Sequence, residues 1–236
     1  MDVLICKKWQ NLAIESWGNV HHVDFHGIFQ ISHKYAGLTD RVLISLLKKG
    51  CQNLISLDLS ASPYLLSHYS LIYIGNICEK LESINLSFTS VQNKTLKHLG
   101  SKLLQLKKIN LARCLHVGEK GLWWLFKDLK HLEYLKLTET TRLSGKCLYM
   151  LPPTLKTVDF NTCSKTKIRC DIAVLSLGTI SNLKLSDLGL KNLAMRCPNL
   201  TNINISLCLS ITNAGVNALL EVSETKLLKK MEKRFD

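Results

Sequence analysis

Nine cysteines are the residues of this 236-residue chain best suited to chemistry, because thiolates bind zinc and pair into disulfides. Their spacing argues against both uses, since no C-x-x-C pair occurs. Six of the nine instead occupy two fixed positions in a repeated pattern. Three lie three residues before a leucine that begins a predicted strand, and three lie three residues after the last apolar residue of one: Cys51, Cys78 and Cys197, then Cys114, Cys163 and Cys208. These positions predict reduced, structural thiols buried between stacked units.

Histidines near the N-terminus form a second candidate cluster. His21, His22, His26 and His33 surround Asp24, and imidazole and carboxylate groups bind transition metals. In the predicted strand, however, His22 and Asp24 share one face, whereas His21 lies on the other. Without tight ligand spacing we predict no metal site here.

Motifs of known catalytic chemistry do not occur. The chain has no G-x-x-x-x-G-K-[ST], no G-x-G-x-x-G after a strand, no H-E-x-x-H and no G-x-S-x-G. Its recurring glycines lie at turn and packing positions instead. We therefore expect a protein without enzymatic activity and without a metal or other cofactor.

Composition predicts a folded protein, with 46% hydrophobic and 21% charged residues. No apolar run is long enough to span a membrane, and the run Val3–Cys6 is too short for a signal peptide. We expect an intracellular protein, cytoplasmic or nuclear, without a membrane partner.

The element that must position all these residues is a unit of strand, turn and helix, seen most clearly in residues 106–122. Leu106, Ile109 and Leu111 give the spacing L-x-x-L-x-L, and a polar turn then leads through Gly121 into a helical run. The same spacing starts again at seven other residues: Val20, Leu54, Leu81, Leu132, Leu155, Ile172 and Leu200. Five of the seven offsets lie between 23 and 28 residues, which is typical of the longer, helix-containing leucine-rich repeat.

A second pattern with the same period marks the helix starts. Each helix start consists of an apolar residue, a capping residue, two variable residues, a small residue and another apolar residue. It occurs at residues 38–43, 66–71, 91–96, 117–122, 143–148, 185–190 and 211–216. The Ser and Thr caps predict hydrogen bonds to first-turn amides, and the small residue allows close approach of the next coil. We predict an α/β fold, a leucine-rich-repeat solenoid or horseshoe with parallel strands on the concave face and helices on the convex face.

The solenoid is predicted over residues 18–220, with seven or eight coils and one irregular region at 155–185. There the strand at 155–160 lacks a following helix start, and Pro152-Pro153 shortens the preceding helix. We favour a further strand at 172–177, although 180–185 also fits the spacing. A basic amphipathic helix at 221–236 is expected to cap the end of the stack.

The repeats resemble the cysteine-containing leucine-rich repeats of the F-box/LRR family, most closely at residues 189–200 and 207–216. Residues 4–13, with Trp17, are similar to the C-terminal half of an F-box, which carries V-C-K-x-W-x-x-L in that family. The resemblance implies a substrate-recognition subunit of a ubiquitin ligase, with the Skp adaptor and through it a cullin as partners. The matching adaptor-binding positions are Cys6, Trp9, Leu12 and Trp17.

This sequence departs from the family because the L-P-x-E/D start that docks the adaptor has no counterpart before Met1. We therefore expect either a fragment or shortened form, or a scaffold or regulator that has lost adaptor binding. In the second case Trp9 and Trp17 only cap the first coil.

The predicted ligand site is the concave face, which carries the residues flanking the middle apolar residue of each strand. Among sixteen such positions two are basic and three acidic, so the net charge of +13 lies on helices, turns and the tail. This distribution argues against a groove for nucleic acid. We predict that an unidentified protein substrate binds around the one aromatic residue of this face, or that these are ordinary solvated residues. The predicted contacts are Lys108, Asn110, Tyr134, Lys136, Thr157 and Asp159.

Overall fold

The computed structural model describes residues 20–25, 38–48, 51–60, 66–140, 143–161, 185–206, 208 and 210–222. Seven short strands form one open parallel sheet whose spatial order follows the chain. They are β1 (His22–Asp24), β2 (Ser56–Asp58), β3 (Ser83–Asn85), β4 (Lys108–Asn110), β5 (Tyr134–Lys136), β6 (Thr157–Asp159) and β7 (Asn202–Asn204). The middle residue of each strand is the middle apolar residue of the predicted spacing, so the positions of these seven strands are confirmed.

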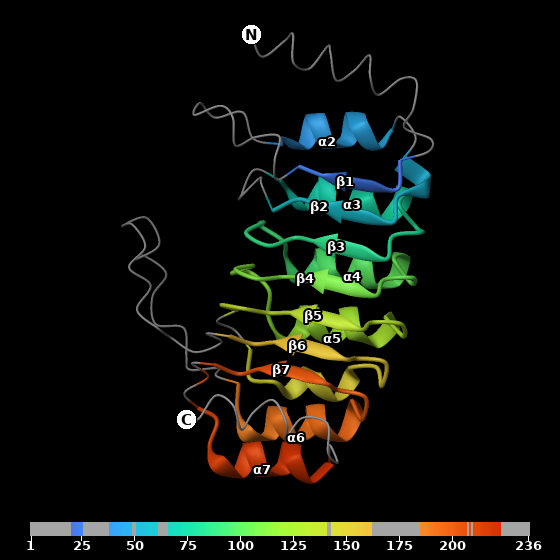
Figure 1. Ribbon diagram of the computed structural model, residues 1–236. Coiled ribbons are helices and arrows are strands. Elements are labelled where there is room, and N and C mark those ends of the chain that lie inside the picture. Colours follow the sequence, from blue (N-terminus) through green and yellow to red (C-terminus); the bar gives the residue numbers. More distant parts are fainter. Residues whose placement is uncertain are drawn as a thin grey trace, which may run out of the picture.

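Helices form a second layer against the sheet, stacked in the same order (Figure 1). They are α2 (Asp40–Leu47), α3 (His68–Ile77), α4 (Asn93–Lys102), α5 (Glu119–Asp128), α6 (Asp187–Arg196) and α7 (Asn213–Val222), with 3-10 helices η2 (Cys51–Asn53) and η3 (Lys146–Met150). The fold is the predicted α/β leucine-rich-repeat solenoid. Across the described ranges, none of these helices has both the length and the apolar character needed to cross a bilayer.

The core lies between the two layers and consists mainly of leucine rows. In the coil of β4, Leu106, Ile109 and Leu111 are fully buried, and Leu122 of α5 meets them from the other layer. At the last coil Ile203 of β7 is only half-buried. A coil in the middle of the stack is thus covered by neighbours on both sides, as expected for a solenoid.

The irregular region differs from the favoured prediction. Strand β6 pairs directly with β7, so no strand lies between them, and residues 162–184, including the predicted strand at 172–177, lie outside the described residues. Helix α6 packs between η3 and α7, which makes it the helix of the β6 coil. The predicted helix start at Ser186 is confirmed, but its assignment to a separate coil is corrected. A local match to the strand spacing could not reveal which segments pair in space.

The predicted cysteine positions are buried wherever they are described. Thr89 and Thr140 share the position of Cys114 and Cys208, and all four donate a hydrogen bond to a backbone carbonyl. The Cys114 Sγ–H lies 3.1 Å from the Leu86 oxygen of the preceding coil. Burial raises the pKa of Cys114 to about 12, so the thiol stays protonated and donates. Cys163 lies outside the described residues.

Hydrogen bonds between coils fix the helix starts. The first residue of a helix accepts from the backbone N–H at the helix start of the next coil, and we call these contacts inter-coil caps. They join Asp40 to Ser67 (2.7 Å), Asn93 to Gly118 (3.0 Å), Glu119 to Gly145 (2.7 Å) and Asp187 to Thr212 (2.8 Å). Thr39 and Ser186 make no side-chain cap within their own helices. The prediction of local caps is correct for Ser67, Ser144 and Thr212, whose hydroxyl oxygens each accept from the backbone N–H two residues later.

At two helix starts the small residue lies against an inter-coil cap. A Cβ atom added to Gly121 would clash with the Asn93 carboxamide, and one added to Gly215 would clash with the Asp187 carboxylate. The predicted reason for a small residue, close approach of the neighbouring coil, is therefore confirmed at these glycines.

Candidate protein-binding face of the sheet

The six predicted contact residues lie together on three adjacent strands. Lys108, Tyr134 and Thr157 are register partners across β4, β5 and β6, and Asn110, Lys136 and Asp159 are register partners one row further on. The alternation of strand residues was sufficient to predict this arrangement, because side chains two residues apart share one face.

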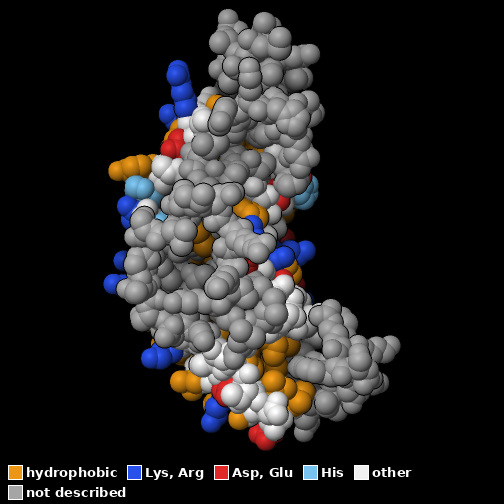
Figure 2. Space-filling model, turned by 90° about the vertical axis from the view of Figure 1, so that its left-hand side faces the viewer, with side chains coloured by type: hydrophobic (Ala, Val, Ile, Leu, Met, Phe, Trp, Pro, Cys, Tyr) orange, Lys and Arg blue, Asp and Glu red, His pale blue; other side chains and the backbone are white. Residues whose placement is uncertain are grey.

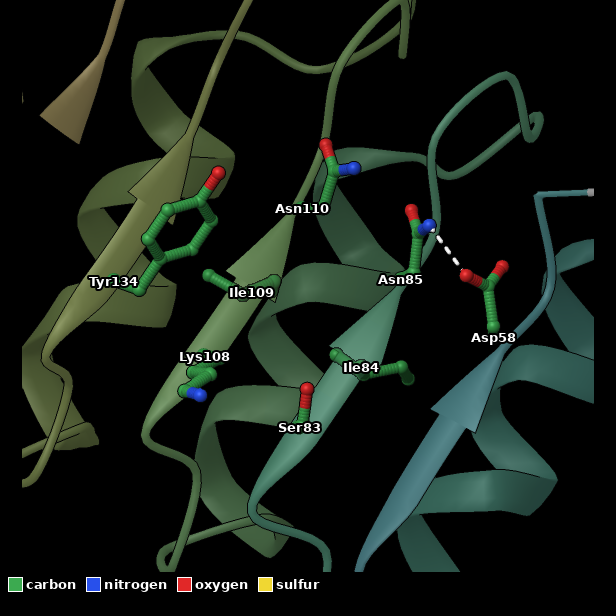
Figure 3. A pocket seen from close by; sticks show the side chains of 8 residues that line it. All are labelled: Asp58, Ser83, Ile84, Asn85, Lys108, Ile109, Asn110 and Tyr134. Carbon is green, nitrogen blue, oxygen red and sulfur yellow. Dashed lines mark hydrogen bonds between the residues drawn. The ribbon is translucent and has the colours of Figure 1, made fainter. Parts of the chain in front are cut away.

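A hollow on this face extends the site toward β2 and β3 (Figure 3). It is lined by Asp58, Ser83, Ile84, Asn85, Lys108, Ile109, Asn110 and Tyr134. Tyr134 lies on one side of the hollow, and on the other the Asn85 amide donates to Asp58 Oδ2 at 2.8 Å. Of the predicted contacts, Lys136, Thr157 and Asp159 lie outside this hollow. Asp58, Ser83 and Asn85, which also flank strand centres, line the hollow although they are not among the predicted contacts.

Most of the Asp and Asn residues on the face stabilise the turn that follows their own strand. The side-chain oxygen of the last strand residue accepts from the backbone N–H two residues later: at Asp58, Asn85, Asn110, Asp159 and Asn204, over 2.8–3.1 Å. Such local bonds turn the backbone and end the strand. One side-chain oxygen of Asn110 and of Asp159 thus already accepts a hydrogen bond within its own turn, so fewer hydrogen-bonding groups of each side chain are available to a ligand.

The two lysines differ in how their charge is balanced. Lys136 replaces the turn-forming Asp or Asn on β5, and its Nζ lies 3.6 Å from Asp159 Oδ2. Lys108 is exposed, and no ion pair to it occurs among the described residues. Lys108 and the half-buried Tyr134 are therefore the groups most available to a partner.

The charges of the sheet face remain balanced in the structure. The residues flanking the strand centres include two lysines, Lys108 and Lys136, and three aspartates, Asp24, Asp58 and Asp159. Lys and Arg side chains instead protrude along the helical, left-hand edge in Figure 2. His22 and Asp24 share the exposed face of β1, as predicted.

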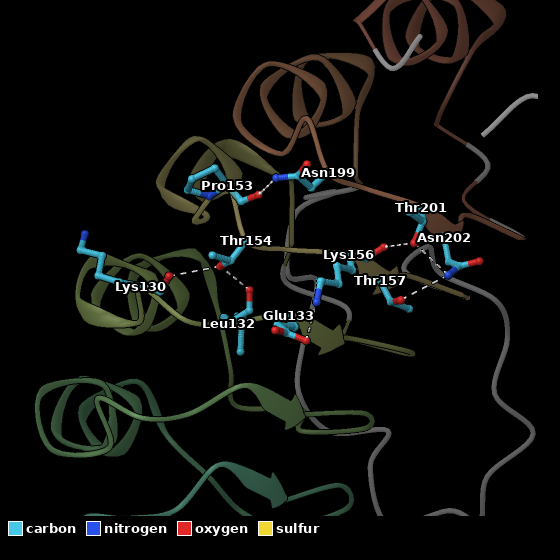
Figure 4. A network of polar contacts seen from close by, with 10 residues as sticks. All are labelled: Lys130, Leu132, Glu133, Pro153, Thr154, Lys156, Thr157, Asn199, Thr201 and Asn202. Carbon is cyan, nitrogen blue, oxygen red and sulfur yellow. Dashed lines mark hydrogen bonds and ion pairs between the residues drawn. The ribbon is translucent and has the colours of Figure 1, made fainter. Parts of the chain in front are cut away.

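A polar network beside the N-terminal ends of β5, β6 and β7 links the last coils (Figure 4). Thr154 Oγ1 lies 2.8 Å from the Leu132 carbonyl, and the Asn199 amide donates to the Pro153 carbonyl at 3.0 Å. Lys156 also pairs with Glu133 at 3.0 Å. These contacts link the coil that carries Tyr134 to the coils that follow it.

The other predicted site, Cys6, Trp9, Leu12 and Trp17, lies outside the described residues, as do residues 223–236 of the predicted capping helix.

Comparison with known proteins gives distant matches, and no family model matches the chain. A Caenorhabditis elegans protein named "Putative RNA-binding protein EEED8.10" is 24% identical over 215 residues, which is 90% of this chain. Those residues are 26% of that protein, so the chain spans about a quarter of its relative.

Three similar solved structures are internalin C2 of Listeria monocytogenes, a chain of the yeast Rad7 and Elc1 complex, and the tropomodulin C-terminal domain of C. elegans. Internalin C2 is 20% identical with a TM-score of 0.46, over 80% of this chain and 74% of that one. The yeast chain is 16% identical with a TM-score of 0.41, over 91% and 63%. The tropomodulin domain is 10% identical with a TM-score of 0.44, over 84% and 98%. The leucine-rich-repeat assignment rests on the strand ladder and its repeating leucines.

Proposed function

We propose that the chain is a protein-interaction module that binds a protein ligand on the concave sheet around Lys108 and Tyr134. The observation that carries this proposal is the hollow beside them, which combines one aromatic anchor with one uncompensated ammonium group. Tyrosine is enriched among residues that dominate binding energy, and a partly enclosed side chain loses little entropy on binding.

The more specific proposal is a substrate-recognition subunit of a Skp–cullin–F-box ubiquitin ligase. It is supported by the resemblance of residues 4–17 to half an F-box and of the repeats to those of the F-box/LRR family. The alternative is an interaction scaffold or regulator that does not bind the adaptor. In both cases the repeats hold the partner protein.

Adaptor binding separates these two functions. If the chain is a ligase subunit, it should co-purify with the Skp adaptor, and both Trp9→Ala and deletion of residues 1–17 should abolish that binding. Tyr134→Ala, on the sheet, should leave it intact and serves as the control. Failure of the unmodified chain to retain the adaptor would favour the scaffold.

Tyr134→Ala should weaken capture of protein partners of the intact chain by roughly 10- to 100-fold, because an interface anchor typically contributes about 2 kcal/mol or more. Quantitative pull-down against the unmodified chain measures this effect. Tyr69→Ala, which removes an exposed tyrosine from α3 on the helical side, is the matched control. Equal capture by all three chains would remove the concave face as the site.

The name of the C. elegans relative raises RNA as a different ligand. An RNA bound through phosphates would show affinity that falls steeply with salt. The balanced charge of the sheet gives no support for such binding there. Salt-sensitive RNA binding that Lys108→Glu abolishes would contradict the proposal of a protein ligand.

A further inference from the structure

An aromatic cluster lies on the helical side, opposite the sheet. Trp123 and Trp124 are consecutive residues of α5, and their rings meet edge to face with centroids 4.7 Å apart. The Trp123 Nε1–H donates to the Tyr149 hydroxyl of η3 at 2.9 Å, which joins two coils. Both indoles are half-buried and Tyr149 is exposed.

Two lysines are held over these rings. Lys97 Nζ of α4 lies 4.6 Å from the Trp124 ring centroid. Lys127 Nζ lies 5.4 Å from the same centroid and 6.0 Å from that of Trp123. Attraction between an ammonium group and an indole face restricts the lysine, so its remaining N–H donors are positioned before any partner arrives.

The surroundings of the cluster carry a strong positive charge. Seven exposed lysines lie on α4, α5, η3 and the turn after α5: Lys94, Lys97, Lys102, Lys120, Lys127, Lys130 and Lys146. The carboxylates of these elements are Glu119 and Asp128, and Glu119 is occupied by the N–H groups of η3. This surplus contrasts with the balanced charge of the sheet and indicates an acidic partner.

The apolar groups of the cluster favour a protein over other polyanions. Nucleic acids bind such sites by stacking bases on free aromatic faces, but these indoles already hold lysines of the same chain. Membrane insertion uses protruding aromatic side chains, whereas both indoles are half-buried. A protein segment can place an apolar side chain against Tyr149 and the indole edges while its carboxylates meet the lysines.

We propose that the surface formed by Lys97, Trp123, Trp124, Lys127 and Tyr149 is a second binding site, which takes an acidic protein segment containing an apolar anchor residue. It lies on the layer opposite the concave sheet, so both ligands can be bound at once. The site is independent of the proposed adaptor and of the proposed substrate.

Selection from a displayed library of random peptides on the full chain tests this proposal. Peptides rich in Asp and Glu with at least one large apolar residue should be enriched. Their affinity should fall at least about 10-fold for Lys97→Glu with Lys127→Glu, because both attraction and pre-positioning are lost. Lys80→Glu with Lys191→Glu, the same change of charge on two other coils, should have a much smaller effect, and Tyr134→Ala none.

Both charge variants alter exposed residues, and circular dichroism establishes that they fold. Enrichment of neutral or basic peptides, no enrichment, or equal loss in both charge variants would overturn the proposal. Poly-uridine RNA and phosphatidylserine vesicles are tested in parallel. Binding of either one through Lys97 and Lys127, with no acidic peptide enriched, would also overturn it and assign the surface to a different polyanion.

Discussion

Leu86→Ala is expected to lower the free energy of unfolding by about 2–5 kcal/mol. Leu86 is the last apolar residue of its strand segment and is fully buried between sheet and helices. Its carbonyl accepts from Thr89 and from Cys114 of the next coil, so collapse of the backbone into the cavity would strain two coils. This is a large share of the total stability of about 5–15 kcal/mol that is typical of folded domains.

Urea unfolding followed by far-ultraviolet circular dichroism measures this effect. Leu104→Ala is the matched control, because the same atoms are removed from a leucine that is 49% exposed. It should cost less than about 1 kcal/mol. Similar midpoints for the two variants would mean that Leu86 does not belong to the core ladder.

Glu119→Ala is expected to destabilise the chain by roughly 2–4 kcal/mol, because hydrogen bonds to a charged group are worth about 1.5–3 kcal/mol and are not additive. The carboxylate accepts from Gly145 N and Cys147 N, each at 2.7 Å, and from the Ser144 hydroxyl at 2.8 Å. Its loss removes the acceptor of the Gly145 and Cys147 N–H groups at the start of η3. Glu82→Ala, which removes an exposed ion pair to Lys107, should cost less than about 1 kcal/mol by the same measurement.

The contribution of Glu119 should also depend on pH. Desolvation raises the pKa of this carboxyl, but hydrogen bonds from Cys147 and Ser144 outweigh it and lower the pKa below the ordinary value of 4.5. A lowered folded-state pKa gives stability that is complete above the unfolded pKa and is lost as the pH falls through the folded one. The difference in stability between the unmodified chain and Glu119→Gln should therefore be constant near neutrality and shrink below about pH 4.5. A difference that grew on acidification would contradict this account.

The fold was largely predictable because each coil buries apolar residues at the same spacing. Leucines at fixed spacing must face the helices, and this alone predicted the positions of the seven described strands. At 155–185, residues 172–177 satisfy the local spacing, but β6 pairs with β7 and α6 packs between η3 and α7. Spacing along the chain carries no information about that contact.

The arrangement of residues on the candidate face was predictable to the same extent. Strand alternation placed Lys108 and Tyr134 side by side, but it could not show that Asn110 and Asp159 end their strands or that Lys136 pairs with Asp159. The inter-coil caps were missed although their signal was present, since Asp40, Asn93, Glu119 and Asp187 all directly follow the predicted capping position. The predicted capping pattern considered hydrogen bonds within one helix only, whereas the inter-coil caps join two successive helices.

The inter-coil caps give the solenoid a direction. In all four, the acceptor belongs to the earlier coil and the donors to the later one, and Ser186 likewise donates its N–H to the Ser144 carbonyl. During synthesis on the ribosome the earlier coil emerges first, and chains generally begin to fold from the N-terminal side. Each new helix therefore meets acceptors that are already in place, so the order of translation and the order of stabilisation coincide.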